Sequence, residues 1–267
     1  MKIIYKYKEF YKKNGLMRTF FKIISKPLRI LNKKKAYKNF INSRNKIFTH
    51  KSIKDRFSYI YSAHYWPSKE SVSGPGSEFQ NTFNIRKGIT KLLHQYKVKK
   101  FLDIPCGDFN WVQSIIKKND VDYIGGDIVS ELIRINKKKF DTSNINFIEI
   151  NLLDDELPSA DLMLCRDCLV HLSNQNVKKF FKNFVNSEIK YLLITSYETD
   201  FEEKNLDHNI DIEDGDFRPT YLMKSPFNLP NPITKILDKD IEHSKNPNLK
   251  CYLYLYSKNQ LKQLIEN

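Results

Sequence analysis

The stretch Phe101-Leu-Asp-Ile-Pro-Cys-Gly-Asp-Phe-Asn-Trp111 decides the fold. Its pattern predicts a buried strand that ends in Asp103, turns at Gly107 and enters a helix. A turn of this kind lets backbone approach a ligand and points a helix N-terminus at it. A second strand, Tyr123-Ile-Gly-Gly-Asp-Ile128, ends in Asp127. A carboxylate there can accept hydrogen bonds from the hydroxyls of a ribose, so the two acids predict a nucleoside-type ligand.

Strands and helices alternate on both sides of this stretch. We expect strands at 100–104, 121–125, 145–150, 161–165 and 191–196, and helices at 81–96, 109–118, 130–139 and 174–185. This alternation is typical of βαβ units, in which helices cover both faces of a parallel sheet. The sequence therefore predicts an α/β protein with a Rossmann-like, doubly wound, mostly parallel sheet. Ligands of such sheets bind at the carboxyl ends of the strands.

The alternation stops between residues 197 and 250, a polar and proline-rich segment. We interpret this segment as an insertion without regular pattern that covers the substrate. Its acidic part, His208-Asn-Ile-Asp-Ile-Glu-Asp-Gly-Asp216, lacks the spacing of a calcium-binding loop and indicates a solvated acidic loop. Residues 251–256 alternate as a strand, and 258–266 are expected to form a closing helix.

Charge divides the chain in two. Residues 1–50 hold fifteen Lys and Arg against one acid, Glu9, whereas residues 51–267 hold thirty residues of each sign. The arm at 1–50 therefore carries the net charge of +14, and its apolar residues recur at helical spacing. This pattern favours an amphipathic helix on an anionic membrane surface. A packed basic helix, a disordered tail and a nucleic-acid-binding arm are the alternatives. We expect one domain at 1–50 and another at 51–267.

The cysteines indicate the compartment. Cys165 and Cys168 form a Cys-x-x-Cys pair, but no second pair or histidine cluster completes a metal site, so no metal is expected. Reduced, buried thiols at all four cysteines favour a cytoplasmic protein. The sequence has no apolar stretch of about 18 residues and no secretory signal. We therefore expect a cytoplasmic protein that is peripheral at the inner face of the membrane through its arm.

Two competing nucleotide-binding motifs are absent, because the first turn lacks both three glycines and a Gly-Lys-Ser/Thr sequence. The turn instead resembles the first motif of class I S-adenosylmethionine (SAM)-dependent methyltransferases. Asp103, Cys106 and Gly107 match that motif, whereas Pro105 and Phe109 replace two glycines that are usual in it. The resemblance implies the fold described above, SAM as the cofactor and S-adenosylhomocysteine (SAH) as its product.

The surrounding segments are similar to methyltransferases encoded among bacterial capsule and surface-polysaccharide genes. The similarity rests on the order of Trp66, Glu70-Ser-Val-Ser-Gly-Pro-Gly-Ser77, the stretch at 102–111, Phe217-Arg-Pro219 and Pro226-Phe-Asn-Leu-Pro230. It implies an acceptor among the precursors of such a polysaccharide.

The resemblance also implies the residues that hold SAM. Asp103 approaches the methionine amine, and Asp127 binds the ribose hydroxyls. The other implied contacts are Pro105, Cys106 and Gly107 on the methionyl and ribose part, Ile128, Asn151 and Leu152 around adenine, and Cys165 and Arg166 near the sulfonium. Trp66, Ser73, Gly74 and Ser77 belong to a loop that we expect to close as a lid over the methionine end. For Asn151, a plain strand-end role is the alternative.

Methyl transfer to a hydroxyl needs an aligned acceptor and a base. Asp167 and His171 are four residues apart, so one helical turn would place them on the same side. We predict that both are catalytic, and that Asp167 orients His171 or acts on the substrate. Packing of His171 under the sheet is the alternative. The candidates for gripping a phosphate- or carboxylate-bearing acceptor are Arg218, Tyr221 and Lys224.

The leading hypothesis is therefore O-methylation of a sugar hydroxyl, or of a phosphate- or phosphoramidate-type group, in a capsular or surface-polysaccharide precursor. The second hypothesis is an RNA or protein methyltransferase that uses the basic arm. The neutral charge of residues 51–267 argues against nucleic acid, as does the lack of an Asn-Pro-Pro-Tyr-type motif after the fourth strand. The third hypothesis is a non-catalytic SAM-binding protein.

Overall fold

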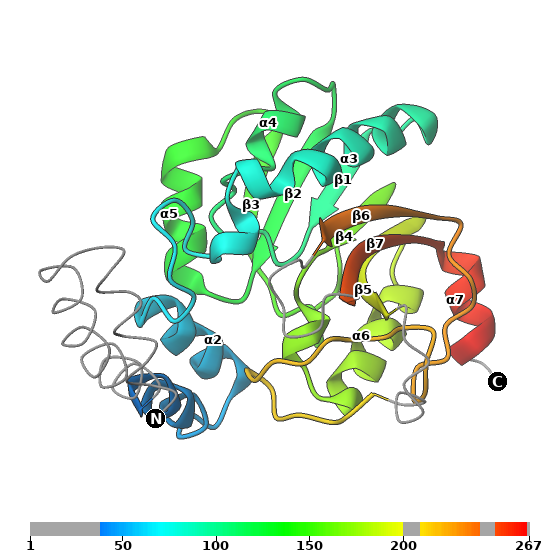
Figure 1. The fold of residues 1–267 in the computed structure, drawn as a ribbon. Coiled ribbons are helices and arrows are strands. Elements are labelled where there is room, and N and C mark those ends of the chain that lie inside the picture. Colours follow the sequence, from blue (N-terminus) through cyan, green and yellow to red (C-terminus); the bar gives the residue numbers. More distant parts are fainter. Residues whose placement is uncertain (1–37, 200–208, 241–248, 266–267) are drawn as a thin grey trace, which may run out of the picture. The chain divides into compact units, whose positions relative to one another are not determined.

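The computed structural model describes residues 38–199, 209–240 and 249–265 (Figure 1). The chain divides into two units, Met1–Thr49 and His50–Asn267. In the first unit residues 38–47 are helical. Residues 1–37, which carry most of the predicted amphipathic pattern of the arm, lie outside the described residues. None of the helices in the described ranges is long and apolar enough to cross a membrane.

The second unit is built on a sheet with the strand order β3-β2-β1-β4-β5-β7-β6 (Figure 1). The strands are β1 (Lys100–Asp103), β2 (Asp122–Asp127), β3 (Ile145–Glu149), β4 (Leu162–Cys165), β5 (Tyr191–Thr199), β6 (Thr234–Asp240) and β7 (Leu249–Ser257). β1 to β5 pair in parallel, whereas β7 is antiparallel to both β5 and β6. The mostly parallel, doubly wound sheet is confirmed. Its strand order reverses between β1 and β4, which is where sheets of this type bind ligands.

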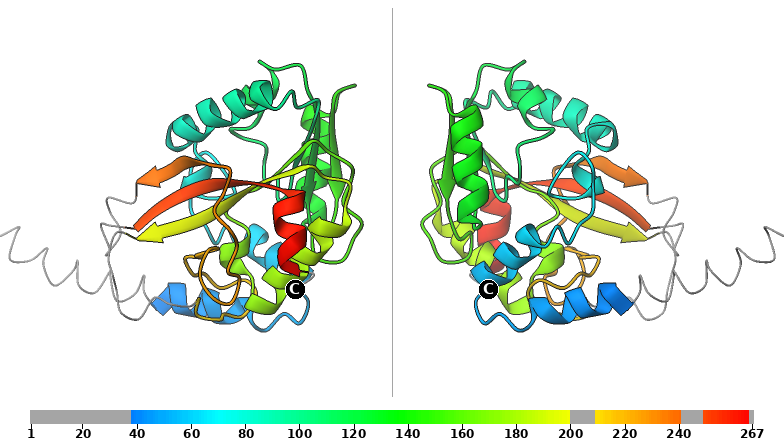
Figure 2. Two further views of the ribbon diagram at one scale, coloured as in Figure 1. Left: turned by 90° about the vertical axis from the view of Figure 1, so that its right-hand side faces the viewer. Right: turned by 90° about the vertical axis from the view of Figure 1, so that its left-hand side faces the viewer.

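Helices cover both faces of the sheet (Figure 2). They are α2 (Ile53–Ser62), α3 (Phe83–Gln95), α4 (Gln113–Ile116), α5 (Ser130–Phe140), α6 (Asn174–Asn186) and α7 (Lys258–Ile265). Single 3-10 turns occur at Pro75–Ser77, Gln80–Thr82 and Leu169–His171. Successive residues of a strand point to opposite faces, so Met163 packs with α6 and Leu164 packs with α3 and α4.

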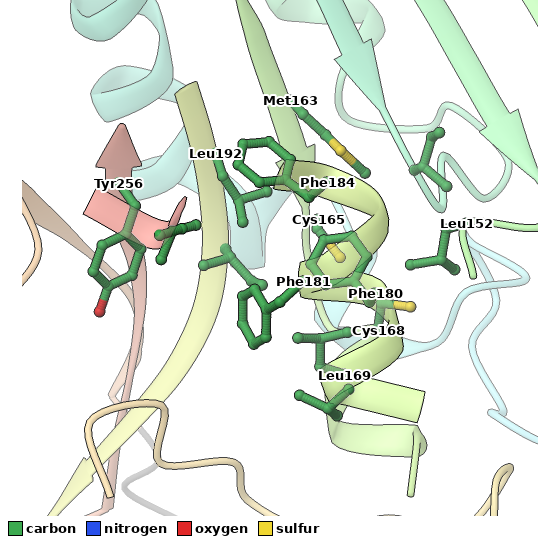
Figure 3. Packing of buried hydrophobic residues seen from close by; sticks show 14 of the residues in the cluster. Leu152, Met163, Cys165, Cys168, Leu169, Phe180, Phe181, Phe184, Leu192 and Tyr256 are labelled. Atoms are coloured by element: carbon green, nitrogen blue, oxygen red, sulfur yellow. The ribbon is translucent and has the colours of Figure 1, made fainter. Parts of the chain in front are cut away.

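The face under α6 holds one of the two large cores of the unit. Figure 3 shows this packing, with Phe180, Phe181 and Phe184 of α6 against Met163, Cys165 and Leu192 of the sheet. The repeat of apolar residues along α6 is the periodicity that predicted this helix. All four cysteines are buried and free, as expected.

Three features of the second unit differ from the prediction. The segment at 197–250 contains β6, an edge strand whose polar sequence Thr-Lys-Ile-Leu-Asp-Lys-Asp hides its alternation. The predicted helix at 109–118 is reduced to α4, because Phe109 has a φ of 58°, which a right-handed helix does not accommodate. α2 was not predicted, although Ser52 caps it by accepting from the backbone N–H of Asp55.

Candidate active site

The turn after β1 is shaped by Gly107, whose φ of 55° favours glycine. A Cβ on Gly107 would overlap with Ser73 Oγ, so Ser73 lies directly on this turn. The carbonyl of Gly107 accepts from Asn136 Nδ2 at 2.7 Å, and Asn136 is buried. The turn is therefore held from both sides, and a Cβ at Gly107 would require the hydroxyl of Ser73 to move.

Asp127 binds the same turn from the end of β2. Its Oδ2 accepts from the backbone N–H of Gly107 at 3.2 Å, and its Oδ1 accepts from that of Val129 at 3.0 Å. Desolvation by burial raises the pKa of Asp127 to about 6, although these backbone donors act in the opposite direction. The fold thus brings together the two features that the sequence predicted for a ligand site, the turn at Gly107 and the carboxylate of Asp127.

Asp103 lies beside Asp127 at the end of β1 and is also buried. Its Oδ2 accepts from the hydroxyl of Tyr123 at 2.9 Å. Burial raises the pKa of Asp103 to about 7, against the hydrogen bond from Tyr123 and the charge of Arg166. Two buried carboxylates at adjoining strand ends form a pair of hydrogen-bond acceptors that suits an ammonium group and a diol.

The loop before α3 lies across these strand ends. The carboxylate of Asp108 accepts from Ser71 Oγ at 3.0 Å and from the backbone N–H of Val72 at 2.9 Å. Asn110 Nδ2 donates to the carbonyl of Ser77 at 3.1 Å. Gly74, with a φ of 89°, leaves only 2.9 Å between an added Cβ and Trp66 Cβ. The loop that carries Trp66, Ser73, Gly74 and Ser77 is therefore fastened to the turn after β1.

Arg166 extends the site from the end of β4. Its Nε and Nη2 donate to the two carboxylate oxygens of Asp238 at 2.8 and 3.0 Å, and Nη2 also donates to the carbonyl of Gly76 at 2.9 Å. Burial opposes the charge of the guanidinium, but the carboxylates of Asp238 and Asp167 raise its pKa. Arg166 thus links β4, β6 and the loop at 71–77. Sequence reasoning missed Asp238, because nothing local marks a partner 72 residues away.

Asp167 follows Arg166 with a φ of 50°, and its backbone N–H donates to Thr195 Oγ1 at 2.8 Å. Asp167, Asp238 and Cys251 each offer a possible metal ligand, and these atoms lie within 4.8 Å of one another. Arg166 already neutralises Asp238 through two hydrogen bonds, so this donor set fits a guanidinium better than a metal ion.

His171 is held by aromatic rings and by a backbone carbonyl. Its ring centroid lies 4.9 Å from that of Trp66 and 5.7 Å from that of Phe217. Its Nδ1 lies 2.7 Å from the carbonyl oxygen of Asp216, a contact in which Nδ1 must carry the proton. In the neutral imidazole this tautomer leaves Nε2 as the basic nitrogen. The packing alternative also has support, since the ring stacks on Trp66.

Arg218 does not lie at the surface as an anion grip would. It is 5% exposed and donates to the carbonyls of Ile210 and Leu169 and to the side chains of Thr220 and Asn174. These bonds bind the guanidinium within the fold, so the geometry disfavours the predicted role for Arg218. Tyr221 is half-buried against Val170, and Lys224 is exposed.

The acidic loop is also more ordered than the sequence indicated. Asp214 Oδ1 accepts from the backbone N–H of Ser173 at 2.8 Å, and Asp211 Oδ1 accepts from that of Asn174 at 2.7 Å. These carboxylates cap the N-terminus of α6, where negative charge is favourable. Asp214 is thus partly buried and bonded, whereas Asp211 caps the helix and remains exposed, as expected for a solvated loop. His208 lies outside the described residues.

The remaining cofactor candidates lie around the same sheet edge. Ile128 is half-buried after Asp127, Pro105 is half-buried, and Leu152 is buried in the core under α6. Burial raises the pKa of the Cys106 thiol, which keeps it neutral. Asn151 uses its side-chain oxygen for the backbone N–H of Leu153 and its Nδ2 for Asp154. That geometry is an Asx turn at a strand end.

Residues 101–187 match the family model of a methyltransferase domain. This part of the chain is a methyltransferase domain. The methyltransferase sheet resembles that of a SAM-dependent methyltransferase from Leishmania major, with a TM-score of 0.55 at 12% identity over 78% of this chain and 87% of that one. The class I methyltransferase fold and SAM as cofactor thus agree with the two buried acids at the strand ends.

Two further solved structures resemble the methyltransferase more weakly. The methyltransferase domain of bacterial CtHen1-C has a TM-score of 0.48 at 14% identity over 66% of this chain and 98% of that one. Human N-acetylserotonin methyltransferase in complex with SAM has a TM-score of 0.43 at 12% identity over 82% of this chain and 65% of that one. No curated protein sequence matches the chain.

Proposed function

We propose that the enzyme O-methylates a neutral sugar hydroxyl in a precursor of a capsular or surface polysaccharide. SAM supplies the activated methyl group on its sulfonium. The observation that carries the proposal is the placement of His171, which stacks on Trp66 while Trp66 packs on the loop that covers Gly107. A potential base and the turn predicted to hold SAM are thereby linked through a single loop.

The proposed roles of the binding residues follow from their chemistry. Asp103 and Asp127 are buried carboxylates, and burial without enough hydrogen-bond donors is costly. An ammonium group and two ribose hydroxyls would supply such donors. The backbone from Pro105 to Gly107 lines the methionyl and ribose part. Ser73 lies on Gly107, and we assign it to the methionine end of SAM.

The proposed chemistry needs one proton transfer by the protein. As the acceptor oxygen attacks the methyl carbon, His171 Nε2 takes the hydroxyl proton, and the carbonyl of Asp216 stabilises the resulting imidazolium through Nδ1–H. The bond between the methyl carbon and the sulfonium sulfur would break as the new C–O bond forms, so the products would be a methyl ether, SAH and protonated His171. Asp167 lies on the same connection between β4 and α6, where we expect it to orient the acceptor.

Charge favours a neutral acceptor over the anionic alternative. Arg166 and Arg218 are both buried and bonded within the chain. The segment facing His171 instead carries the acids Asp211, Glu213, Asp214 and Asp216. An anionic acceptor would meet like charge there.

Mass spectrometry of surface glycans from cells with and without the gene tests the proposal. Loss of one O-methyl group from a sugar, restored by the wild-type gene but not by His171→Ala, is the expected result. An unchanged glycan profile would refute the polysaccharide assignment. We further propose that the protein works in the cytoplasm at the inner face of the membrane, where its basic arm meets anionic lipid.

A further inference from the structure

Phe217 is an exposed aromatic residue on a firmly anchored loop. Its side chain is 55% exposed. The residues on both sides are nevertheless fixed, because the backbone N–H of Gly215 donates to the carbonyl of His171 at 2.7 Å and that of Arg218 donates to the carbonyl of Val170 at 2.9 Å. The fold therefore holds the ring of Phe217 in solvent at a set position.

That position is beside the proposed base. The ring centroid of Phe217 lies 5.7 Å from that of His171, with an angle of 53° between the rings. Trp66 lies on the same imidazole, 4.9 Å from it. A ligand whose hydroxyl reaches His171 would therefore lie beside the exposed ring of Phe217.

We propose that Phe217 is the residue on which the pyranose ring of the acceptor stacks. This inference rests on the proposed function. The C–H groups on one face of a pyranose carry partial positive charge, and the face of an aromatic ring carries negative charge. Stacking would leave the sugar hydroxyls at the rim, so that one of them can face His171.

The surrounding charges favour this ligand over an anion. Asp216 precedes Phe217, while Asp211 and Asp214 hold the start of α6. Arg218, the cation next to Phe217, donates into the fold through its Nε, Nη1 and Nη2. A neutral ring with an apolar face thus fits the loop better than a phosphate or a carboxylate does.

Two measurements on the full-length enzyme test the proposal. The first uses unmethylated surface glycan, extracted from cells that lack the gene, as the acceptor. Phe217→Ala should raise its KM at least tenfold and leave SAH affinity and the pH profile of kcat unchanged, whereas Phe217→Trp should stay near wild type. Phe83→Ala is the matched control, because Phe83 is 62% exposed at the start of α3. It should change nothing.

The second measurement uses methyl hexopyranosides as probes in saturation-transfer NMR. Signals from the ring C–H protons should be present with wild type and lost with Phe217→Ala. If wild type transfers methyl to the glycan but Phe217→Ala keeps the KM, the stacking role is wrong and the proposed function stands. If wild type does not methylate the glycan yet the Phe217-dependent signals are present, the polysaccharide assignment fails and the sugar site stands. The inference would be overturned if Phe217→Ala shifted the pH profile of kcat. It would also be overturned if p-cresol, but no hexopyranoside, gave Phe217-dependent NMR signals.

Discussion

The indole of Trp66 lies on the imidazole of His171, with the ring centroids 4.9 Å apart and the planes inclined by 33°. Trp66 precedes the first strand and His171 follows the fourth, so the contact joins two segments that meet only at the carboxyl edge of the sheet. Gly74 makes the contact possible, because any side chain at position 74 would overlap with Trp66.

Replacing Trp66 should therefore impair the proposed base, His171, more than the proposed cofactor site. A ring pair of this kind contributes about 0.5–1.5 kcal/mol, so Trp66→Ala should lower kcat roughly 2- to 12-fold. Trp66→Phe retains a ring and should lose less. Steady-state kinetics together with SAH calorimetry give the answer. A weaker SAH affinity with unchanged kcat would assign Trp66 to the cofactor and not to His171.

Asp127 offers the most direct test of the cofactor site. Asp127→Ala removes an acceptor for the ribose hydroxyls and should weaken SAH binding by about 1.5–3 kcal/mol, the range for hydrogen bonds to a charged group. Asp122→Ala is the matched control, because Asp122 begins the same strand and is exposed. Equal affinity of both variants by calorimetry, in folded protein, would remove Asp127 from the site.

The raised pKa values of Asp103 and Asp127, about 7 and about 6, link folding to pH. A carboxyl whose pKa is higher in the folded than in the unfolded state binds more protons when folded. The free energy of unfolding should therefore fall as the pH rises from about 4 to about 7. Asp103→Asn removes the larger part of this slope. Urea denaturation at a series of pH values measures it, and a wild-type stability that rises over this window would contradict the expected sign.

The same two acids should link SAH binding to proton release. An ammonium group beside Asp103 favours the ionised carboxylate, so binding near pH 6 should expel a proton and the affinity should increase from pH 5.5 to pH 8. Calorimetry in buffers of different ionisation enthalpy counts the protons. Asp103→Asn should abolish most of the effect, whereas an identical proton count in this variant would place the linkage elsewhere.

The basic arm should be separable from the catalytic unit, which begins at His50. A chain that starts there should remain folded and should lose binding to phosphatidylserine vesicles, since each basic residue near such a surface contributes on the order of 1 kcal/mol. Vesicle sedimentation at low salt compares it with the full chain. If the full chain ignores these vesicles but binds RNA with a steep salt dependence, the membrane role of the arm is wrong.

The sequence was most informative where local pattern determines structure. The short, nearly continuous buried runs of β1, β2 and β5 and the repeat along α6 are local patterns, so these elements were predicted within a few residues. The placement of Asp103 and Asp127 at the same edge of the sheet followed from the topology, because neighbouring parallel strands end at one edge. In contrast, α2 was missed although Ser52 and Asp55 supplied a capping signal.

The residues whose surroundings the sequence did not reveal have partners far away in the chain. Arg218 looked like a surface cation because two of its four acceptors, Leu169 and Asn174, lie 49 and 44 residues away. The helix-capping contacts of Asp211 and Asp214 were missed because their donors, the backbone N–H groups of Asn174 and Ser173, lie at the start of α6. β6 was missed because an edge strand needs few apolar residues. The burial of a side chain and its hydrogen-bond partners depend on the tertiary structure, so a local sequence pattern does not predict them.

The buried pair of Arg166 and Asp238 provides the last prediction. Its side chains are 5% and 0% exposed, so neither charge can be left alone without a large cost. Asp238→Ala should lower the free energy of unfolding by roughly 3–5 kcal/mol, the range for breaking a buried ion pair. Arg166→Met with Asp238→Leu should recover most of that loss, because both charges are then gone.

The double variant also separates stability from function. Arg166 holds the carbonyl of Gly76, so the double variant releases the loop at 71–77 even where the fold is restored. We expect faster tryptic cleavage near Lys69 and weaker SAH binding in a protein whose denaturation midpoint is near wild type. Urea denaturation, limited proteolysis and calorimetry on the same preparations decide this. Wild-type SAH affinity in a stable double variant would show that the loop is held at the cofactor site without Arg166.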